Sequence, residues 1–381
     1  MIRFSAPALH ASPELLWVLR RAFGPAGESP APAPAIAEAV GALATALDLA
    51  PRLAARGTAG LPFARARRRA LAQSLRLTEL AHDVASVARG LGTPVAFLKF
   101  GALELSGRLL PGSRNAGDLD VLVPVHQAEP LAEALAARGF SRSPIPGWKH
   151  QLPALHSPTG ATLEIHLCVP GVFADASFED LSALGALEAL ESIPGGFVPN
   201  PSTLVAHALA HALEQHGHHP AAHAAMRLLG DLADIGFHGA EGERLAGEVE
   251  ALAGSSVSPG EVRAALDLTT ALVAGELPDS RSAQALLSHL VASHVSPEYA
   301  RALKSRAKLT LAGLSRALFP SRAEIDVLYP KLRFPGGAVL ARALRPFDLA
   351  TRLAGSLRAG ERLRRSEMQL NGLSSASRAH G

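Results

Sequence analysis

Two aspartates, Asp118 and Asp120, stand two residues apart in the segment RNAGDLDVLVP, residues 114–124. Its aliphatic end, LDVLVP, is the kind of short run that forms a buried strand. Residues i and i+2 of a strand point to the same face, roughly 6–7 Å apart. The pattern therefore directs two carboxylates into one small space, where like charge and burial raise their pKa values. A divalent cation such as Mg²⁺, which prefers oxygen ligands, relieves this conflict and suits phosphoryl or nucleotidyl transfer.

A third carboxylate lies on a second predicted strand, TLEIHLCV, residues 162–169. If the aliphatic residues of this strand fill the core, Glu164 and His166 face the other way, where Glu164 can meet the two aspartates. Other interpretations stay open. One aspartate can cap a turn while the other is exposed, Glu164 can face solvent from an edge strand, and His166 can pack or support a ligand rather than bind a metal.

Two basic residues flank this acidic pattern. Lys99 lies near the end of the first predicted strand, VAFLKF, residues 95–100, and Arg114 precedes the aspartates. Lys99 can reach a phosphate or extend into solvent from the strand end. Arg114 can neutralise triphosphate charge or hold Asp118 in place, because its planar guanidinium is a good bidentate donor.

The later helical part of the chain carries further polar residues. His207 and His211 share one helix face, yet the position next to His207, where a zinc protease has glutamate, is an alanine, so packing or lining of a cleft is favoured over metal binding. In RLLGDLADIG, Asp231 and Asp234 lie three residues apart. Asp231 either faces a nucleotide, orders Arg227, or belongs to a polar stripe at a helix–sheet junction.

The chain resembles the uncharacterised nucleotidyltransferase family within the DNA polymerase β-like superfamily. Members carry an LKG-like strand, an R…D[IL]D strand, a later ElH strand and a helical tail with a His-rich and an Asp-containing segment. The resemblance covers about residues 65–240 and extends more loosely to about 330. The matching segments, in order, are FLKFGALELSGRLLPGSRNAGDLDVLVP, HQLPALHSPTGATLEIHL, STLVAHALAH and RLLGDLADIG.

The resemblance implies a small mixed sheet whose acidic triad, Asp118, Asp120 and Glu164, is both catalytic and metal-binding. In the superfamily such a triad holds two divalent ions, Mg²⁺ or Mn²⁺. An acceptor hydroxyl attacks the α-phosphorus of a nucleoside triphosphate (NTP), and pyrophosphate leaves. The residues expected to contact the nucleotide are Lys99, Gly101, Arg114 and Gly117.

One part of the motif departs from the family. The glycine-rich turn usually has Gly-Gly or Gly-Ser, whereas this chain has Gly101-Ala102, and Phe100 separates Lys99 from Gly101. Phosphate binding would then depend on backbone N–H groups of the turn and the helix start. The same departure supports an alternative function, a catalytically degenerate protein of this fold that binds a nucleotide or a partner.

The predicted fold class is α+β, with a small mixed sheet flanked by helical segments at both ends. Of the 381 residues, 48% are hydrophobic and only 4% aromatic, which favours a core of Leu, Ala and Val on helices. The predicted strands are 95–100, 119–124 and 162–169. The predicted helices are 13–24, 35–55, 62–89, 127–140, several between 170 and about 318, and 338–365.

Four regions are predicted along the chain. They are an N-terminal helical segment (1–90), a nucleotidyltransferase-like catalytic module (91–185), a C-terminal helical domain (186–330), and a final helix with a disordered tail (331–381).

Composition narrows the compartment and the partners. Cys168 is the only cysteine, which excludes an internal disulfide and a thiolate metal cluster and favours a reducing compartment. No apolar run reaches the ~18 residues that span a bilayer, so a cytoplasmic protein without a transmembrane segment is expected. The arginine runs at 65–69 and 358–365 lack interleaved aromatics, which favours solvated helix faces over nucleic-acid binding.

The expected activity is metal-dependent transfer of a nucleoside monophosphate from an NTP to an acceptor hydroxyl, with release of pyrophosphate. The acceptor is a small molecule, a peptide or a protein, with nucleic acid less favoured. Neither a Ser-His-Asp order nor a Walker-type glycine loop is present, which argues against hydrolase and P-loop chemistry.

Overall fold

The computed structural model describes residues 12–25, 32, 36–145, 147, 149–173, 175–215, 225–253 and 257–295. These residues form an α+β fold, as predicted from the sequence. The predicted helix at 338–365 and the predicted tail lie outside the described residues. None of the helices in these ranges is long and apolar enough to cross a membrane.

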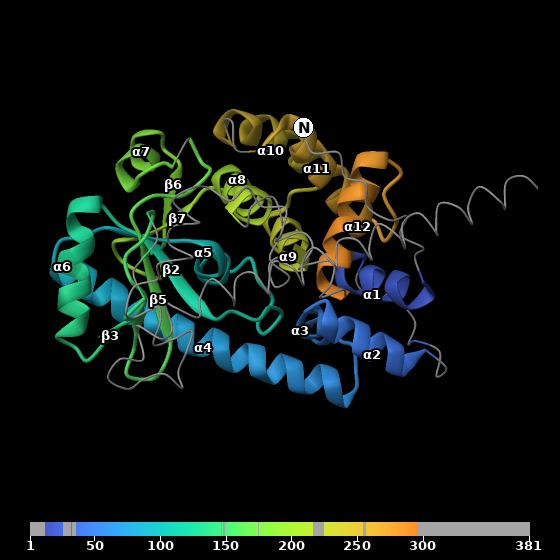
Figure 1. The fold of residues 1–381 in the computed structure, drawn as a ribbon, viewed down its shortest axis with the longest axis horizontal. Coiled ribbons are helices and arrows are strands. Elements are labelled where there is room, and N and C mark those ends of the chain that lie inside the picture. Colours follow the sequence, from blue (N-terminus) through green and yellow to red (C-terminus); the bar gives the residue numbers. More distant parts are fainter. Residues whose placement is uncertain are drawn as a thin grey trace, which may run out of the picture.

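A mixed sheet forms one end of the molecule (Figure 1). Within the described residues it has seven strands in the order β3-β4-β5-β2-β1-β7-β6, and β2 is parallel to β5 and β1 to β7. The strands are β1 (Val95–Phe97), β2 (Asp118–Leu122), β3 (Ser141–Arg142), β4 (Leu155–His156), β5 (Thr162–His166), β6 (Leu187–Ala189) and β7 (Gly196–Pro199).

The central strands carry the alternating pattern that the sequence shows. Leu119 and Val121 on β2, and Leu163 and Ile165 on β5, are buried in the core. The parallel register places Asp120 opposite Glu164. Strands β6 and β7 were not predicted, because residues 187–199 lie in a part of the chain expected to be helical; they extend the sheet beyond β1.

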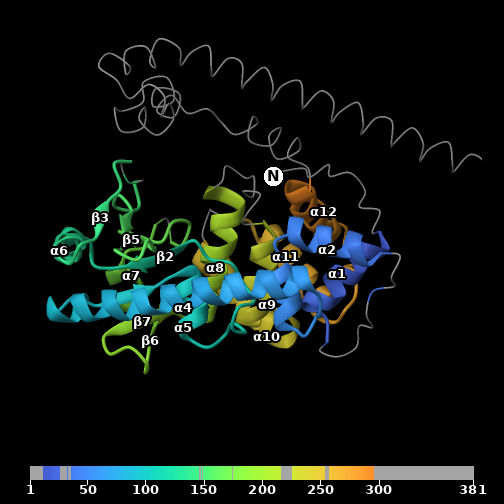
Figure 2. The same ribbon diagram turned by 90° about the horizontal axis from the view of Figure 1, so that it is seen from below.

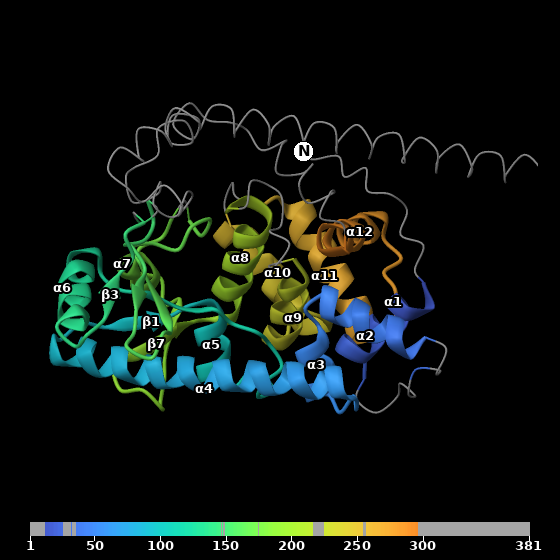
Figure 3. The same ribbon diagram turned by 60° about the horizontal axis from the view of Figure 1, so that its bottom comes forward.

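A long helix, α4 (Leu61–Gly90), runs beneath both halves of the molecule, from α6 (Val125–Ala136) at the sheet end to the N-terminal helices (Figures 2 and 3). Its start and end agree with the predicted helix at 62–89. Pro62 lies in its first turn, where a missing N–H is tolerated, and Gly92 just after it adopts φ +68°. The helix therefore links the sheet to the helical end.

The predicted helix at 35–55 is two helices, and the single-helix prediction was wrong. Helix α2 ends at Ala46 and α3 begins at Ala50, with Pro51 in the first turn of α3. Between them, Asp48 adopts a left-handed conformation, φ +58°, that no regular helix contains. The break turns the side chain of Asp48 toward the body of the protein, where it pairs with Arg227.

The remaining helices cover the sheet and build the other end of the molecule. One hydrophobic core includes residues from α1 through α12, so the three predicted regions within the described ranges share a single core. Helix α1 packs on α11, and α2 on α12. The helices are α1 (Pro13–Phe23), α2 (Ala37–Ala46), α3 (Ala50–Ala55), α5 (Lys99–Leu105), α7 (Phe178–Ala183), α8 (Pro201–Ala210), α9 (Ala225–Ile235), α10 (Gly239–Ala253), α11 (Pro259–Val273) and α12 (Arg281–Val295).

Shortening a central strand residue should destabilise the fold. Leu163 is fully buried on β5, and Leu163→Ala should lower the free energy of unfolding by about 2–5 kcal/mol because it removes buried methyl groups and leaves a cavity. Leu75, which is 63% exposed on α4, provides the control: Leu75→Ala should change it by less than about 0.5 kcal/mol. Urea denaturation of both variants measures this, and equal effects would contradict the assignment of β5 to the core.

Candidate active site

The three predicted carboxylates, Asp118, Asp120 and Glu164, line one pocket of about 490 Å³. Asp118 and Asp120 are on β2 and Glu164 is on the neighbouring parallel strand β5, directly opposite Asp120. The side chains thus meet because two strands with period-2 spacing lie in register. Helices α5, α8 and α9 supply the other walls. The pocket is lined by Lys99, Phe100, Leu103, Arg114, Ala116, Asp118, Asp120, His150, Gln151, Glu164, Leu204, His207, Ala208, His211, Ala212, Arg227, Leu228, Asp231 and Ile235.

Asp120 is the most enclosed of the three carboxylates, with 2% of its surface exposed. Its Oδ1 atom lies 2.7 Å from Lys99 Nζ and 2.9 Å from His166 Nε2. Burial by itself would raise the pKa of Asp120, but Lys99 and His166 outweigh burial and hold this pKa well below its ordinary value. Asp120 therefore stays ionised, and both contacts use the same oxygen, leaving Oδ2 as the atom for another ligand.

Lys99 reaches this position through an unusual backbone. It is the first residue of α5 and has φ +47°, in the left-handed region that costs a non-glycine residue about 1–2 kcal/mol. Burial lowers the pKa of Lys99, but the nearby Asp120, Asp118 and Glu164 raise it by more, so the side chain is an ammonium. The sequence left open whether Lys99 reaches a phosphate or extends into solvent; in the structure it contacts Asp120, inside the same pocket.

The other two carboxylates are not neutralised in this way. Burial, and then the charge of Asp120, raise the pKa of Glu164 to about 7 and raise the pKa of Asp118 as well. Both shifts follow from negative charges held close together away from water. A further cation bound beside Glu164 and Asp118 would stabilise their ionised forms.

Two pocket side chains and the adjacent His166 are spaced as metal ligands. Ligand atoms of Asp120, Glu164 and His166 lie within 4.8 Å of one another. The carboxylate oxygens of Asp120 and Glu164 suit Mg²⁺ or Mn²⁺, which prefer hard oxygen ligands, and Asp118 offers a further carboxylate at the same face of β2. Asp120 would then contact both the Lys99 ammonium and the ion. The donor set therefore fits a divalent cation bound beside Lys99.

Several pocket residues carried little or no sequence signal. His207 is 2% exposed, its Nε2 has no hydrogen-bond partner in the described parts of the chain, and burial lowers its pKa to about 3. Its spacing from His211 had suggested that it lines a cleft, and it does. His150, which stacks on His166 with ring centroids 5.6 Å apart, and Gln151 come from a loop that pairs with the end of β5. No local pattern marks such a loop.

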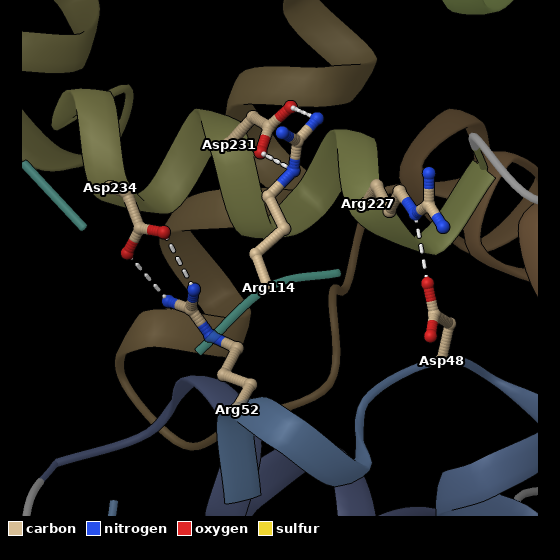
Figure 4. Close-up of polar contacts among 6 residues, drawn as sticks. All are labelled: Asp48, Arg52, Arg114, Arg227, Asp231 and Asp234. Atoms are coloured by element: carbon tan, nitrogen blue, oxygen red, sulfur yellow. Dashed lines mark hydrogen bonds and ion pairs between the residues drawn. The ribbon is translucent and has the colours of Figure 1, made fainter. Parts of the chain in front are cut away.

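Helix α9 forms one wall of the pocket and carries paired charges (Figure 4). Arg114 contacts Asp231 through two nitrogen–oxygen distances of 2.9 Å and lies over the ring of Phe100. The hypothesis that Asp231 orders Arg227 was wrong: Asp231 orders Arg114, and Arg227 Nε pairs with Asp48 at 2.8 Å. Arg114 therefore lines the pocket without contacting Asp118.

A second pair on α9 fixes the helix to the N-terminal part of the chain. Asp234 receives two hydrogen bonds from Arg52 on α3, at 2.7 and 2.9 Å (Figure 4). Arg52 also donates to the carbonyl oxygen of Ala22. Helix α3, itself tied to α1, thus holds the helix that walls the pocket.

The two predicted glycines have different surroundings. Gly101 lies inside α5, where a Cβ would meet the Leu119 side chain at 2.9 Å, so glycine allows α5 to approach β2 closely. It is buried and does not line the pocket. Gly117 lines a second pocket beside the first. Contact of either residue with a nucleotide stays a prediction.

Replacing Lys99 should show that Asp120 requires a positive charge beside it. Lys99→Met leaves Asp120 buried without its ammonium and should destabilise the fold by about 3 kcal/mol. Millimolar Mn²⁺ should restore part of this loss, since a cation can replace the ammonium, and the double variant Lys99→Met/Asp120→Asn should also recover stability. Thermal denaturation with and without Mn²⁺ measures both. Lys149→Met, at an exposed lysine, is the control; no recovery in the double variant would refute the pairing.

The raised pKa of Glu164 predicts a pH-dependent stability. The folded protein holds this proton up to about pH 7, whereas the unfolded chain releases it near the ordinary pKa of 4.5, so stability falls as pH rises between these values. Glu164→Gln removes that decline, and the variant should gain stability relative to wild type from pH 4.5 to 7. Urea midpoints across this range, in a metal chelator, test it. A constant difference would count against the shift, and Glu188→Gln, exposed on β6, is the matched control.

Comparison with known proteins gave no relative against which this site could be interpreted. No family model, curated protein or solved structure matches the chain. The function is therefore inferred from the side chains that line the pocket.

Proposed function

We propose that this protein is a metal-dependent nucleotidyltransferase that moves a nucleoside monophosphate from an NTP to an acceptor hydroxyl. One observation carries the proposal: Asp118, Asp120 and Glu164 converge on the floor of a single pocket from two strands in register. The volume, about 490 Å³, lies in the range of small-ligand sites. The family resemblance in the sequence supports the same function.

The pocket combines the two charge types that this substrate needs. Lys99, Arg114 and Arg227 line it together with the carboxylates. Guanidinium and ammonium groups bind phosphate oxygens, and here they are held in place by Asp120, Asp231 and Asp48 before a ligand arrives. A triphosphate would lie along these cations, with its α-phosphorus toward the carboxylates.

Asp118, Asp120 and Glu164 would hold the divalent ions. Bound there, a divalent ion neutralises charge on the phosphate oxygens and makes the acceptor hydroxyl more acidic. Lys99 holds Asp120 ionised, which keeps it ready as a ligand. His166, hydrogen-bonded to the same aspartate, fixes the direction of its carboxylate.

The reaction is an in-line substitution at phosphorus. The acceptor oxygen forms a bond to the α-phosphorus, the bond from this phosphorus to the oxygen that bridges to the β-phosphate breaks, and pyrophosphate leaves with that electron pair. The hydroxyl proton passes to a carboxylate on the pocket floor.

A second candidate function rests on the contact between Lys99 and Asp120. Because the ammonium already neutralises this aspartate, the most buried part of the site is stable without a metal. This favours a degenerate protein of the same fold that binds a nucleotide or a partner. The two candidates differ in whether NTP binding and turnover require Asp118 and Asp120.

Transfer activity should depend on the aspartates. Wild-type protein incubated with each α-labelled NTP and Mg²⁺ or Mn²⁺ should release pyrophosphate and pass label to an acceptor in cell extract or to the protein itself. Asp118→Asn and Asp120→Asn should lower the rate by about 100-fold or more, because each removes an ion ligand. Glu188→Gln, an exposed acidic residue of the same sheet, should keep full activity.

Other outcomes of this assay are equally informative. Nucleotide binding without label transfer, with the same affinity in wild type and in both aspartate variants, would support the binding-module function. Transfer that persists in both variants would show that the reaction does not require Asp118 or Asp120, and would contradict the proposed active site. Equilibrium dialysis with labelled NTP, run with and without Mn²⁺, separates binding from turnover.

A further inference from the structure

A second pocket, of about 580 Å³, adjoins the candidate active site. Three residues, Ala116, Asp118 and Arg227, line both pockets, so the two meet at the start of β2. An acceptor must bring its hydroxyl to the carboxylates from some side of the nucleotide. The second pocket is lined by Thr45, Ala46, Asp48, Arg69, Gln73, Asn115, Ala116, Gly117, Asp118 and Arg227.

Two buried carbonyl oxygens in this pocket lack hydrogen-bond partners. Asn115 Nδ2 donates to Asp48 Oδ1 at 2.7 Å, and because a carboxylate only accepts, this bond fixes the orientation of the amide. Asn115 Oδ1 and Gln73 Oε1 are then buried acceptors without a donor in the described residues. Leaving such a group unsatisfied destabilises the folded protein. Both oxygens are closed off from water, so a ligand that brings hydroxyl groups would satisfy them once the two side chains turn toward the pocket.

One arginine that lines the pocket has no carboxylate partner among the described residues. Arg69, on α4, lines the pocket, is exposed and makes no ion pair with any described residue. Arg65 and Arg76 are also exposed and lie four residues before and seven after it, on the same helix face. This short stripe can bind an anionic group. None of the residues lining the pocket is aromatic, whereas grooves for nucleic-acid strands stack bases on aromatic side chains.

We propose that the second pocket binds the acceptor and that the acceptor is a sugar phosphate or polyol phosphate. Its hydroxyls contact Asn115 Oδ1 and Gln73 Oε1, its phosphate lies on Arg69, and its reacting hydroxyl reaches Asp118. This assignment rests on the nucleotidyl transfer proposed above, because only that reaction makes the bound compound an acceptor. The bonds made and broken are those given above, with this hydroxyl as the attacking group.

Direct binding tests the pocket without any turnover. Full-length protein is titrated with ribose 5-phosphate, glycerol 3-phosphate and glucose 1-phosphate, without NTP or metal, by calorimetry and saturation-transfer NMR. At least one should bind, and Gln73→Leu should weaken it about tenfold or more while leaving the protein as stable as wild type or more so, since an unsatisfied acceptor is removed. Arg69→Gln should weaken the phosphorylated compounds and not ribose, glycerol or glucose.

A matched control exists on α6. Gln127 Oε1 is also buried without a partner, but Gln127 lines neither pocket, so Gln127→Leu should leave binding unchanged.

Binding of a short RNA is a further comparison. Binding of the RNA but not of the free compounds, lost in Gln73→Leu, would identify a terminal nucleotide as the source of the sugar phosphate. RNA binding that Gln73→Leu leaves intact, without binding of the free compounds, overturns the inference.

The remaining outcomes separate this inference from the proposed function. If no probe binds, or if Gln73→Leu binds as wild type does, the sugar-phosphate pocket is wrong, and label transfer to a different acceptor would leave the nucleotidyltransferase standing. If a sugar phosphate binds in a Gln73-dependent way but no NTP is ever turned over, the pocket stands as a binding site and the transferase fails.

Discussion

A buried contact between Lys99 and Asp120 constrains the rest of the structure. The two charged atoms lie 2.7 Å apart, and Asp120 has almost no contact with water. Because a buried charge that loses its partner costs about 3–5 kcal/mol, removing either side chain alone would destabilise the fold. Three elements must therefore meet at one point: α5, which begins with Lys99 at a strained φ of +47°, β2, which carries Asp120, and β5, whose His166 binds the same oxygen. The floor of the pocket follows from this meeting.

The wall of the pocket follows from a second set of charges, on α9. Its aspartates bind arginines that come from far away in the sequence, Arg114 to Asp231 across 117 residues and Arg52 to Asp234 across 182. These pairs have little exposure, so they have the geometry in which bidentate guanidinium–carboxylate contacts specify position. The N-terminal helices thereby become part of the site's support, although none of their side chains lines the first pocket.

What the sequence could predict was local. The alternation in DLDVL and TLEIH identified two strands and the face that carries Asp118, Asp120 and Glu164, because strand periodicity is a property of neighbouring residues. The α+β class and the long helix at 62–89 were predicted on the same basis. The partners of Asp231 and Asp48 and the strands at 187–199 were not, since each depends on residues distant in sequence. The break at Asp48 does have a local signal, Pro51 in the first turn of α3, which the single-helix prediction did not use. The Ala- and Leu-rich stretch 35–55 has helical composition throughout, and a tertiary ion pair accompanies the turn that interrupts it.

The charges around the pocket also bear on whether it is catalytic. Arg114 and Arg227 are each paired with a carboxylate of their own, Asp231 and Asp48, whereas Lys99 pairs directly with a floor carboxylate, Asp120. Burial first, and then the charge of Asp120, still raise the pKa values of Glu164 and Asp118. A pKa shift is a difference in free energy, about 1.4 kcal/mol per unit, that the folded protein bears whenever these groups ionise. A binding module that relied on Lys99 could replace Glu164 with glutamine and lose this cost. A divalent cation bound beside Glu164 would offset this cost, which is the condition that the nucleotidyl transfer proposed above requires.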